Sequence, residues 1–267
     1  MDPPRFPREL YNIVVNLLHD QVSTLKKVAL VDRASANICQ AYLFRQLTLR
    51  TRRMQHLDTV TATPCFKLYD ILTSSPHLAT RIKNLTVDNR EPSEVDTDQY
   101  PFVALVVEDG FLPIVLHALS HITHLRLFLD FLSWSSLSPS LKSSIQKTFA
   151  SPNLLDITVV ELNDIPLSLF CASSGLHRLC LLHTTFASDI SLDVHDRHRL
   201  ETLDLIADDP RQLLDQSSPF NLTHLRKISI SLGLSFRIHV QSLNLLLENN
   251  ASTLESLGLH ICTLIIA

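Results

Sequence analysis

The sequence predicts an α/β fold in which short parallel strands alternate with helical or loop segments, preceded by a small helical module. Three observations carry this prediction. Leucine supplies 50 of the 267 residues, one apolar pattern recurs between residues 44 and 259, and the residues before it follow helical spacing instead. An excess of one apolar residue type within a recurring pattern is typical of repeat architectures.

The recurring pattern is apolar-x-x-apolar-x-apolar, and it occurs eight times. The last four intervals between copies are 22, 24, 25 and 29 residues, counted from Leu154 to Leu254, and they fall in the range of leucine-rich repeats. The sequence therefore predicts an irregular leucine-rich-repeat solenoid, with residues 51–267 as one domain. The eight copies are Phe44, Leu47, Leu49; Ile82, Leu85, Val87; Ile122, Leu125, Leu127; Leu154, Ile157, Val159; Leu176, Leu179, Leu181; Leu200, Leu203, Leu205; Leu225, Ile228, Ile230; and Leu254, Leu257, Leu259.

Each copy has the length of one short strand with a bend before it. Its second and third apolar residues are two apart, so they point to one face, and stacking the copies in a parallel sheet makes a continuous core. Four return segments show helical spacing, namely 66–72, 111–119, 145–149 and 240–247. Only eight residues follow Leu259, with no polar cap over the last strand, and this favours either truncation at the C-terminus or a stacking partner.

Residues 1–50 are predicted to form a separate module of three short helices. The first helix follows Pro7, and the third leads into the first strand. A bundle of about 40 residues has too small a core to be stable alone, so it is expected to pack on the solenoid or on a partner. The apolar residues of the first helix are Leu10, Ile13, Val14, Leu17 and Leu18.

Composition excludes several functional classes. The net charge is −4 and the Lys and Arg residues are spread along the chain, so no nucleic-acid partner is expected. The four glycines lie far apart, which excludes the common phosphate-binding loops. No apolar run reaches about 18 residues, so no membrane is expected as a partner. The start MDPPRFPREL lacks a signal sequence, and five cysteines without a C-x-x-C pair favour a cytoplasmic and/or nuclear protein that is not secreted.

Residues that alternate with the apolar triplets point to the opposite, concave face of such a sheet, where solenoids bind partners. One position on this face is apolar in four consecutive copies: Phe128, Val160, Leu182 and Ile206. Its charged border consists of Arg126, Asp156, Arg178 and Asp204. An apolar centre with a polar rim is typical of protein interfaces, so these eight residues are the predicted partner-binding site. The alternative is that the row lies under a loop as ordinary core.

Candidate chemistry gives no catalytic, metal or cofactor site. His117, His121 and His124 offer part of a metal-ligand spacing, but no carboxylate or cysteine lies close in sequence to complete it. The serines lack the G-x-S-x-G pattern of a nucleophile elbow. We therefore expect a protein that is not an enzyme, with an undetected hydrolase as a rival class. A second group of candidate metal-ligand residues consists of Cys171, His177, Cys180 and His183.

Three segments carry a family resemblance. The run from Phe6 and Pro7 through Glu9 and Leu10 resembles the L-P-x-E-[IL] opening of F-box domains. The stretch ALVDRASANICQAYLFRQLTL, residues 29–49, is similar to the continuation common in F-box proteins of mushroom-forming fungi. SSPHLATRIKNLTV, residues 74–87, is similar to the segment that follows in that family. The resemblance covers about the first third of the chain, and a leucine-rich remainder is usual for the family.

The resemblance implies a non-catalytic substrate receptor of a cullin-RING ubiquitin ligase. Its N-terminal helices would bind the adaptor subunit, and the concave face would hold the client protein. At two positions the chain departs from the family: Asp32 stands where the family has Cys, and Ser35 where it has Trp. We expect both positions to be buried, so that polar residues there weaken the module. An alternative is therefore a leucine-rich-repeat scaffold with a decayed F-box. When this chain is matched to the F-box pattern residue by residue, the resemblance implies that the adaptor contacts Phe6, Pro7, Leu10, Val14 and Leu18. These five residues could instead pack in the chain's own core.

Overall fold

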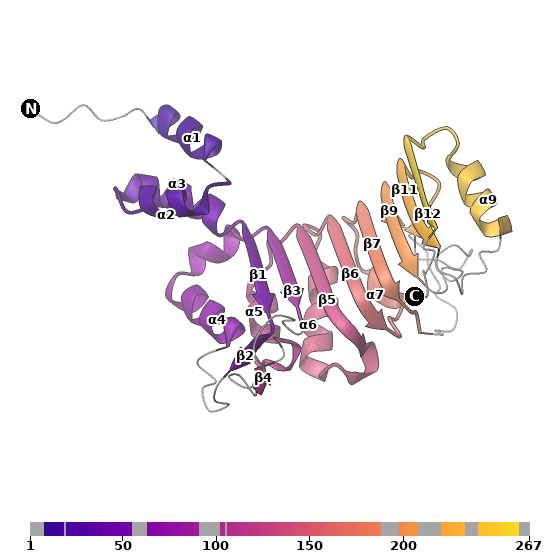
Figure 1. The fold of residues 1–267 in the computed structure, drawn as a ribbon, viewed down its shortest axis with the longest axis horizontal. Helices are drawn as coiled ribbons and strands as arrows, with labels where there is room; N and C mark the ends of the chain where they lie inside the picture. The colour runs from indigo at the N-terminus through magenta and orange to yellow at the C-terminus, as the bar shows by residue number, and fades with distance from the viewer. Residues whose placement is uncertain are drawn as a thin grey trace, which may run out of the picture.

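A parallel β-sheet forms the body of the molecule in the computed structural model, with three helices at its N-terminal end (Figure 1). The sheet has eight strands and the fold is α/β, which confirms the predicted class and the parallel arrangement. The structure describes residues 8–18, 20–54, 63–90, 102–104, 106–187, 198–207, 220–232 and 240–261.

Strands join the sheet in the order in which they occur in the chain. Because each strand pairs with its predecessor on one edge and its successor on the other, every strand-and-return unit contacts mainly its neighbours. The strands are β1 (Gln46–Arg50), β3 (Asn84–Asp88), β5 (His124–Ser133), β6 (Asp156–Asn163), β7 (Arg178–Thr184), β9 (Thr202–Ala207), β11 (Lys227–Leu232) and β12 (Ser256–Ile261). Two small sheets pair β2 (Arg52–Met54) with β4 (Phe102–Ala104) and β8 (His198–Arg199) with β10 (Phe220–Asn221).

The eight copies of the apolar pattern are aligned across the sheet. Leu125 pairs with Leu85 on one side and with Ile157 on the other, and the same alignment continues to Leu179 and Leu203. All eighteen triplet residues of the second to seventh copies are at most 2% exposed. Burying one aliphatic side chain contributes roughly 1.5–3 kcal/mol, so the stacked triplets are the main source of the sheet's stability.

Helices cover the sheet face to which the triplets point. Leu72, Val115 and Ile145, from three different helices, are buried in the same core as the strand residues. Figure 1 shows the return helices α5 to α7 behind the strands. The helical returns predicted over 66–72, 111–119, 145–149 and 240–247 are thus confirmed as helices. The return helices are α4 (Pro64–Ser74), α5 (Leu112–Ala118), α6 (Pro139–Phe149), α7 (Ser168–Cys171) and α9 (Val240–Asn250), with 3-10 turns at Pro76–Thr80, Val106–Glu108 and Trp134–Ser136.

Two return helices, α4 and α6, begin with the same local chemistry. The hydroxyls of Thr63 and Ser138 accept the backbone N–H groups of Phe66 and Leu141, and a proline follows each cap. Hydroxyl caps satisfy N–H groups that the first turn of a helix leaves free, and proline at the first position costs no hydrogen bond.

Within the described residues, no helix has the length and apolar character that crossing a membrane requires.

An aromatic cluster joins the return segments of the central repeats. The Phe170 ring lies 5.6 Å from Phe149 of α6 and 5.7 Å from Phe220 of β10, measured between ring centroids. All three phenylalanines are at most 2% exposed. The leucine pattern did not predict this cluster, because its members lie in the segments between the strands.

The last strand differs from those before it. Leu257 and Leu259 of β12 are 43% and 48% exposed, whereas Ile228 and Ile230, their partners on β11, are each 2% exposed. No described element packs over this edge of the sheet, so two core positions of the repeat lie at the surface.

The N-terminal module consists of α1 (Arg8–Leu17), α2 (Val22–Val28) and α3 (Arg33–Leu43). Its small core is separate from that of the sheet and is formed by Val15, Leu25 and Cys39, which are at most 1% exposed. Three helices were expected here, and the described residues contain them. β1 belongs to the sheet, so the boundary predicted at residue 50 falls at the end of its first strand.

Asp32 and Ser35 form the start of α3. The Asp32 carboxylate accepts the Ser35 backbone N–H at 2.8 Å and the Ser35 hydroxyl at 3.2 Å. Asp32 is exposed and Ser35 is completely buried. The expectation of two buried positions was therefore wrong for Asp32, because that residue stands outside the helix as its N-cap. The buried Ser35 hydroxyl has a partner, so these two residues stabilise the helix start.

Candidate functional site

The face of the sheet opposite the helices carries the side chains that alternate with the buried triplets, and we call it the open face. Phe128, Val160, Leu182 and Ile206 are direct neighbours in register on four adjacent strands. The structure thus brings the predicted residues together, and we call them the apolar row. Val160 is 6% exposed and fills the space between its neighbours, whereas the other three are half-buried and offer apolar surface.

Three charged residues of the predicted border form an ion-pair triad. Arg178 lies between the two carboxylates, with its Nη2 2.8 Å from Asp204 Oδ2 and its Nη1 3.7 Å from Asp156 Oδ2. The hydrogen bond with Asp204 and the nearby charge of Asp156 raise the pKa of Arg178. Two carboxylates share one guanidinium, so the triad carries a net negative charge next to the apolar row.

Arg126, the fourth charged border residue, lies on the open face of β5. In register it stands between Thr86 and Thr158, and no carboxylate of the described chain forms an ion pair with it. The side chain is exposed. It therefore offers an uncompensated positive charge beside Phe128, opposite in sign to the triad, which lies on the same side of the row on β6, β7 and β9.

One end of the apolar row is held by a residue that the sequence did not single out. The Arg90 guanidinium lies over the Phe128 ring at 4.4 Å from its centroid. Its Nε and Nη2 donate to the two Asp88 carboxylate oxygens at 2.9 and 3.1 Å. A guanidinium over an aromatic face is attracted to the ring, and here it also fixes the orientation of Phe128. No short motif marks Arg90, because the ring that it covers comes from the neighbouring strand β5.

β5, β6 and β7 leave regular strand geometry immediately after the apolar row. Asp130, Phe131, Glu161 and His183 have φ between 52° and 58°, a left-handed conformation that costs non-glycine residues of order 1 kcal/mol each. The pairing register also shifts at these points. This bulged margin leaves Phe131 59% exposed beside the row, which enlarges the apolar surface. The bulged margin could not be predicted from the sequence, since none of these positions is glycine or asparagine.

The residues carried over for adaptor binding separate into three groups. Phe6 and Pro7 lie outside the described residues. Leu10 and Val14 on α1 are 43% and 41% exposed, and Leu18 packs against the small core of the module. Leu18 thus faces the module's own interior.

Two exposed residues on the same helix were not among the carried-over set. Ile13 and Leu17 are 55% and 76% exposed. With Leu10 and Val14 they follow the i, i+3, i+4, i+7 spacing of one helix face, which we call the α1 stripe. Their helical spacing was visible in the sequence, but not which side of the helix faces the module.

Within the described ranges, the thiols and imidazoles do not gather into a metal site. No group of three or more His, Cys, Asp or Glu residues in the described ranges could hold a metal ion. His117 and His121 lie on the helix side of the sheet, whereas His124 begins β5 and its Nδ1 is 2.8 Å from the Thr123 hydroxyl. Burial, with a further contribution from the Asp204 charge, raises the pKa of the Cys180 thiol to about 11, so this thiol stays protonated near neutral pH.

No family model matches this chain, and no curated protein matches it either. Function is therefore inferred from the residues and from their geometry.

Proposed function

We propose that the chain is a non-catalytic, F-box-type substrate receptor built on a leucine-rich-repeat solenoid. The α1 stripe and its neighbours would bind the adaptor of a cullin-RING ubiquitin ligase, and the open face would bind a client protein. The observation that carries the proposal is the apolar row, aligned across four adjacent strands and bordered by charge of both signs.

The solenoid assignment is supported by the repeat and by the strand order. Each copy of the leucine pattern supplies one parallel strand, and the described return helices α4, α5, α6 and α7 pack into the core on the side to which the triplets point. Such units cannot bury their apolar residues alone, so they are stable when stacked.

The open face suits a protein client because of its size and composition. Eight strands at about 4.8 Å spacing span on the order of 35 Å, which matches a standard protein interface. The partly exposed Phe128, Leu182 and Ile206 offer apolar contact, and Arg126 and the triad offer charges of opposite sign. Aromatic and arginine side chains at the centre of an interface commonly carry most of its binding energy.

The adaptor assignment is supported by the family resemblance and by the α1 stripe. Leu10, Ile13, Val14 and Leu17 are apolar and exposed on a helix whose opposite side holds the module together. Leu30 and Val31, between α2 and α3, are 87% and 69% exposed and add to the apolar surface of the module. Exposure of several apolar residues on so small a module is costly unless a partner covers them.

A binding measurement between the full chain and the purified adaptor tests the proposal. We expect binding at micromolar concentrations and a loss of at least about 30-fold for Leu10→Asp combined with Val14→Asp, because a contact at the centre of an interface contributes about 2 kcal/mol or more. Asn37→Asp is the matched control, since Asn37 is exposed on α3. Failure of the wild-type chain to bind the adaptor would contradict the ligase role and leave the scaffold alternative.

A further inference from the structure

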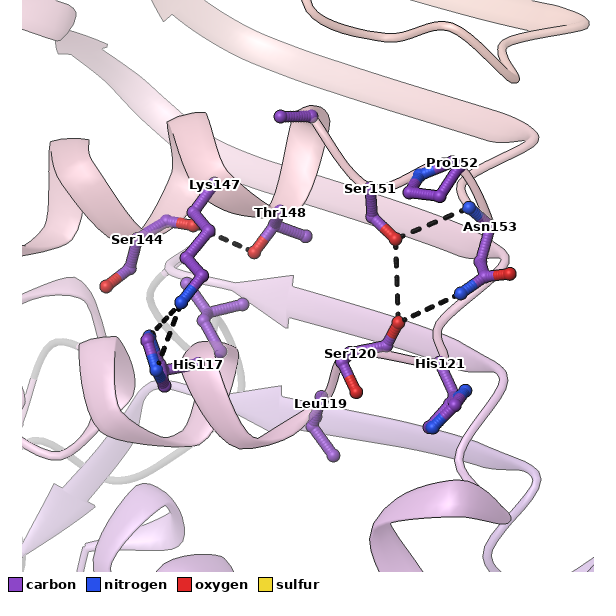
Figure 2. A pocket seen from close by; sticks show the side chains of 12 residues that line it. His117, Leu119, Ser120, His121, Ser144, Lys147, Thr148, Ser151, Pro152 and Asn153 are labelled. Carbon is purple, nitrogen blue, oxygen red and sulfur yellow. Dashed lines mark hydrogen bonds between the residues drawn. The ribbon is translucent and has the colours of Figure 1, made fainter.

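A pocket of about 440 Å³ opens between α5 and α6, on the helix side of the sheet and away from the apolar row (Figure 2). Its base contains Leu116 and Leu119, which are 2% and 1% exposed, and its rim includes Ala150 and Pro152. Pockets for small organic molecules have volumes of about 300–1,000 Å³ and largely apolar walls with a few polar groups. The size and lining of this pocket fit that description.

The polar groups at one end of the pocket are basic. Lys147 Nζ lies 3.2 Å from His117 Nδ1 and 3.1 Å from His117 Nε2, so the ammonium lies against the imidazole ring, which has at most one acceptor nitrogen. His121 lies apart from this pair, beyond Ser120 (Figure 2). No carboxylate lines the pocket or forms an ion pair with Lys147, His117 or His121 in the part of the chain that the structure describes.

The lysine keeps donor capacity that the chain does not use. An ammonium has three N–H donors, and the described residues accept from Lys147 only through the His117 ring. The Ser120 hydroxyl also makes no hydrogen bond to the described part of the chain. A ligand carboxylate beside Lys147 would accept from these unused N–H donors.

The walls of the pocket are tied in place before any ligand arrives. The Ser120 carbonyl accepts from the Asn153 side-chain amide at 3.2 Å and from the Ser151 hydroxyl at 3.5 Å, which links the segments that follow α5 and α6. Ser144 of α6 donates to the Pro113 carbonyl of α5 at 3.1 Å. A pocket shaped by such cross-links loses little conformational entropy on binding.

Charge balance favours a singly charged ligand. α5 and α6 both end at the pocket, and the C-terminal ends of helices carry partial negative charge. This negative potential offsets part of the lysine charge, so one carboxylate is better matched than a phosphate group. The buried leucines favour an apolar body attached to that carboxylate.

We infer that this pocket binds a small organic monocarboxylate, with the carboxylate at Lys147 and an aliphatic body over Leu116 and Leu119. The proposal does not depend on the receptor function, since the pocket lies on the other side of the sheet. Lys147 sits in the last turn of α6, where a cation also stabilises the helix end, so stability and binding have to be measured separately.

Calorimetric titration of the full chain with sodium octanoate tests the inference. We expect a Kd of about 1 mM or tighter, and binding at least about tenfold weaker in Lys147→Met. Lys142→Met is the control, because Lys142 lies on the same helix but donates to the Ser135 carbonyl outside the pocket. Ala150→Phe adds a large side chain at an exposed position on the rim of the pocket and should also abolish octanoate binding. This variant replaces Lys147→Met in the test if Lys147→Met fails to fold.

Two further ligands test the chemical class. 1-Octanol has the apolar body without the charge, and inorganic phosphate has the charge without the body; both should bind at least about tenfold more weakly than octanoate. The inference is overturned if octanoate does not bind, if either of these binds as tightly, or if Lys147→Met lowers the melting temperature while octanoate binding is unchanged.

Discussion

Charged side chains on the open face form pairs and triads, and the charges that stay uncompensated define what a partner meets. Arg178 holds Asp156 and Asp204, and Arg90 holds Asp88 while it covers Phe128. Arg126 has no such counter-charge in the described chain. A client is therefore expected to place an apolar side chain on the row and an acidic group near Arg126.

The Asp88–Arg90 pair makes stability depend on pH. Burial alone would raise the pKa of Asp88, but the hydrogen bonds and the charge of Arg90 outweigh burial and lower it. A carboxyl whose folded-state pKa is lowered contributes stability above its unfolded pKa of about 3.9 and loses that contribution as pH falls through the folded-state pKa. Asp88→Asn should thus cost about 1 kcal/mol near pH 7 and show a shallower loss of stability below about pH 4.

Urea unfolding between about pH 3 and 7 checks this prediction. Asp70→Asn is the control, because Asp70 is exposed on α4 and pairs with no described cation. Equal dependence on pH in the wild-type chain and in Asp88→Asn would show that the Arg90 contact does not stabilise the fold.

Single elements show which parts of the structure the sequence could predict. The parallel strands were predictable because every copy leaves a local signal, such as Leu176, Leu179 and Leu181 at fixed spacing. The bulged margin was not, because Phe131 and Glu161 adopt a backbone conformation that their residue types do not favour. Which residues point to the open face could be predicted from strand alternation. The partial burial of the apolar row could not, because it depends on side chains from neighbouring strands.

The turn between α7 and β7 depends on close backbone approach at Gly175. A Cβ at this position would lie 2.5 Å from the Pro152 carbonyl oxygen, a backbone atom that cannot move without displacing the turn before β6. Gly175→Ala should therefore destabilise the protein by about 1–3 kcal/mol. At Gly110 no atom lies within 4 Å of an added Cβ, so Gly110→Ala should be close to neutral. Thermal melting of the two variants compares them directly, and equal melting temperatures would contradict the tight contact.

At the scale of the whole molecule, the repeats stabilise one another. Leu179 is fully buried and pairs with Ile157 and Leu203 on the two neighbouring strands. Leu179→Asp places an unpaired charge in this stack and should unfold the flanking repeats along with its own. Hydrogen exchange should show loss of protection in β6, β7 and β9 together. Thr48→Asp, at an exposed position on β1, is the control, and protection lost only in β7 would contradict the stack.

In the proposed function, the apolar row holds a client protein while the N-terminal helices hold the adaptor. Quantitative affinity purification from native cells tests it most directly, comparing the wild-type chain with Phe128→Ala combined with Leu182→Ala. Ile71→Ala with Ile114→Ala is the matched control, because both residues are exposed on return helices. We expect the row variant to stay folded, to retain the adaptor and to lose at least one other partner that the control keeps. Retention of every partner by the folded row variant would contradict it.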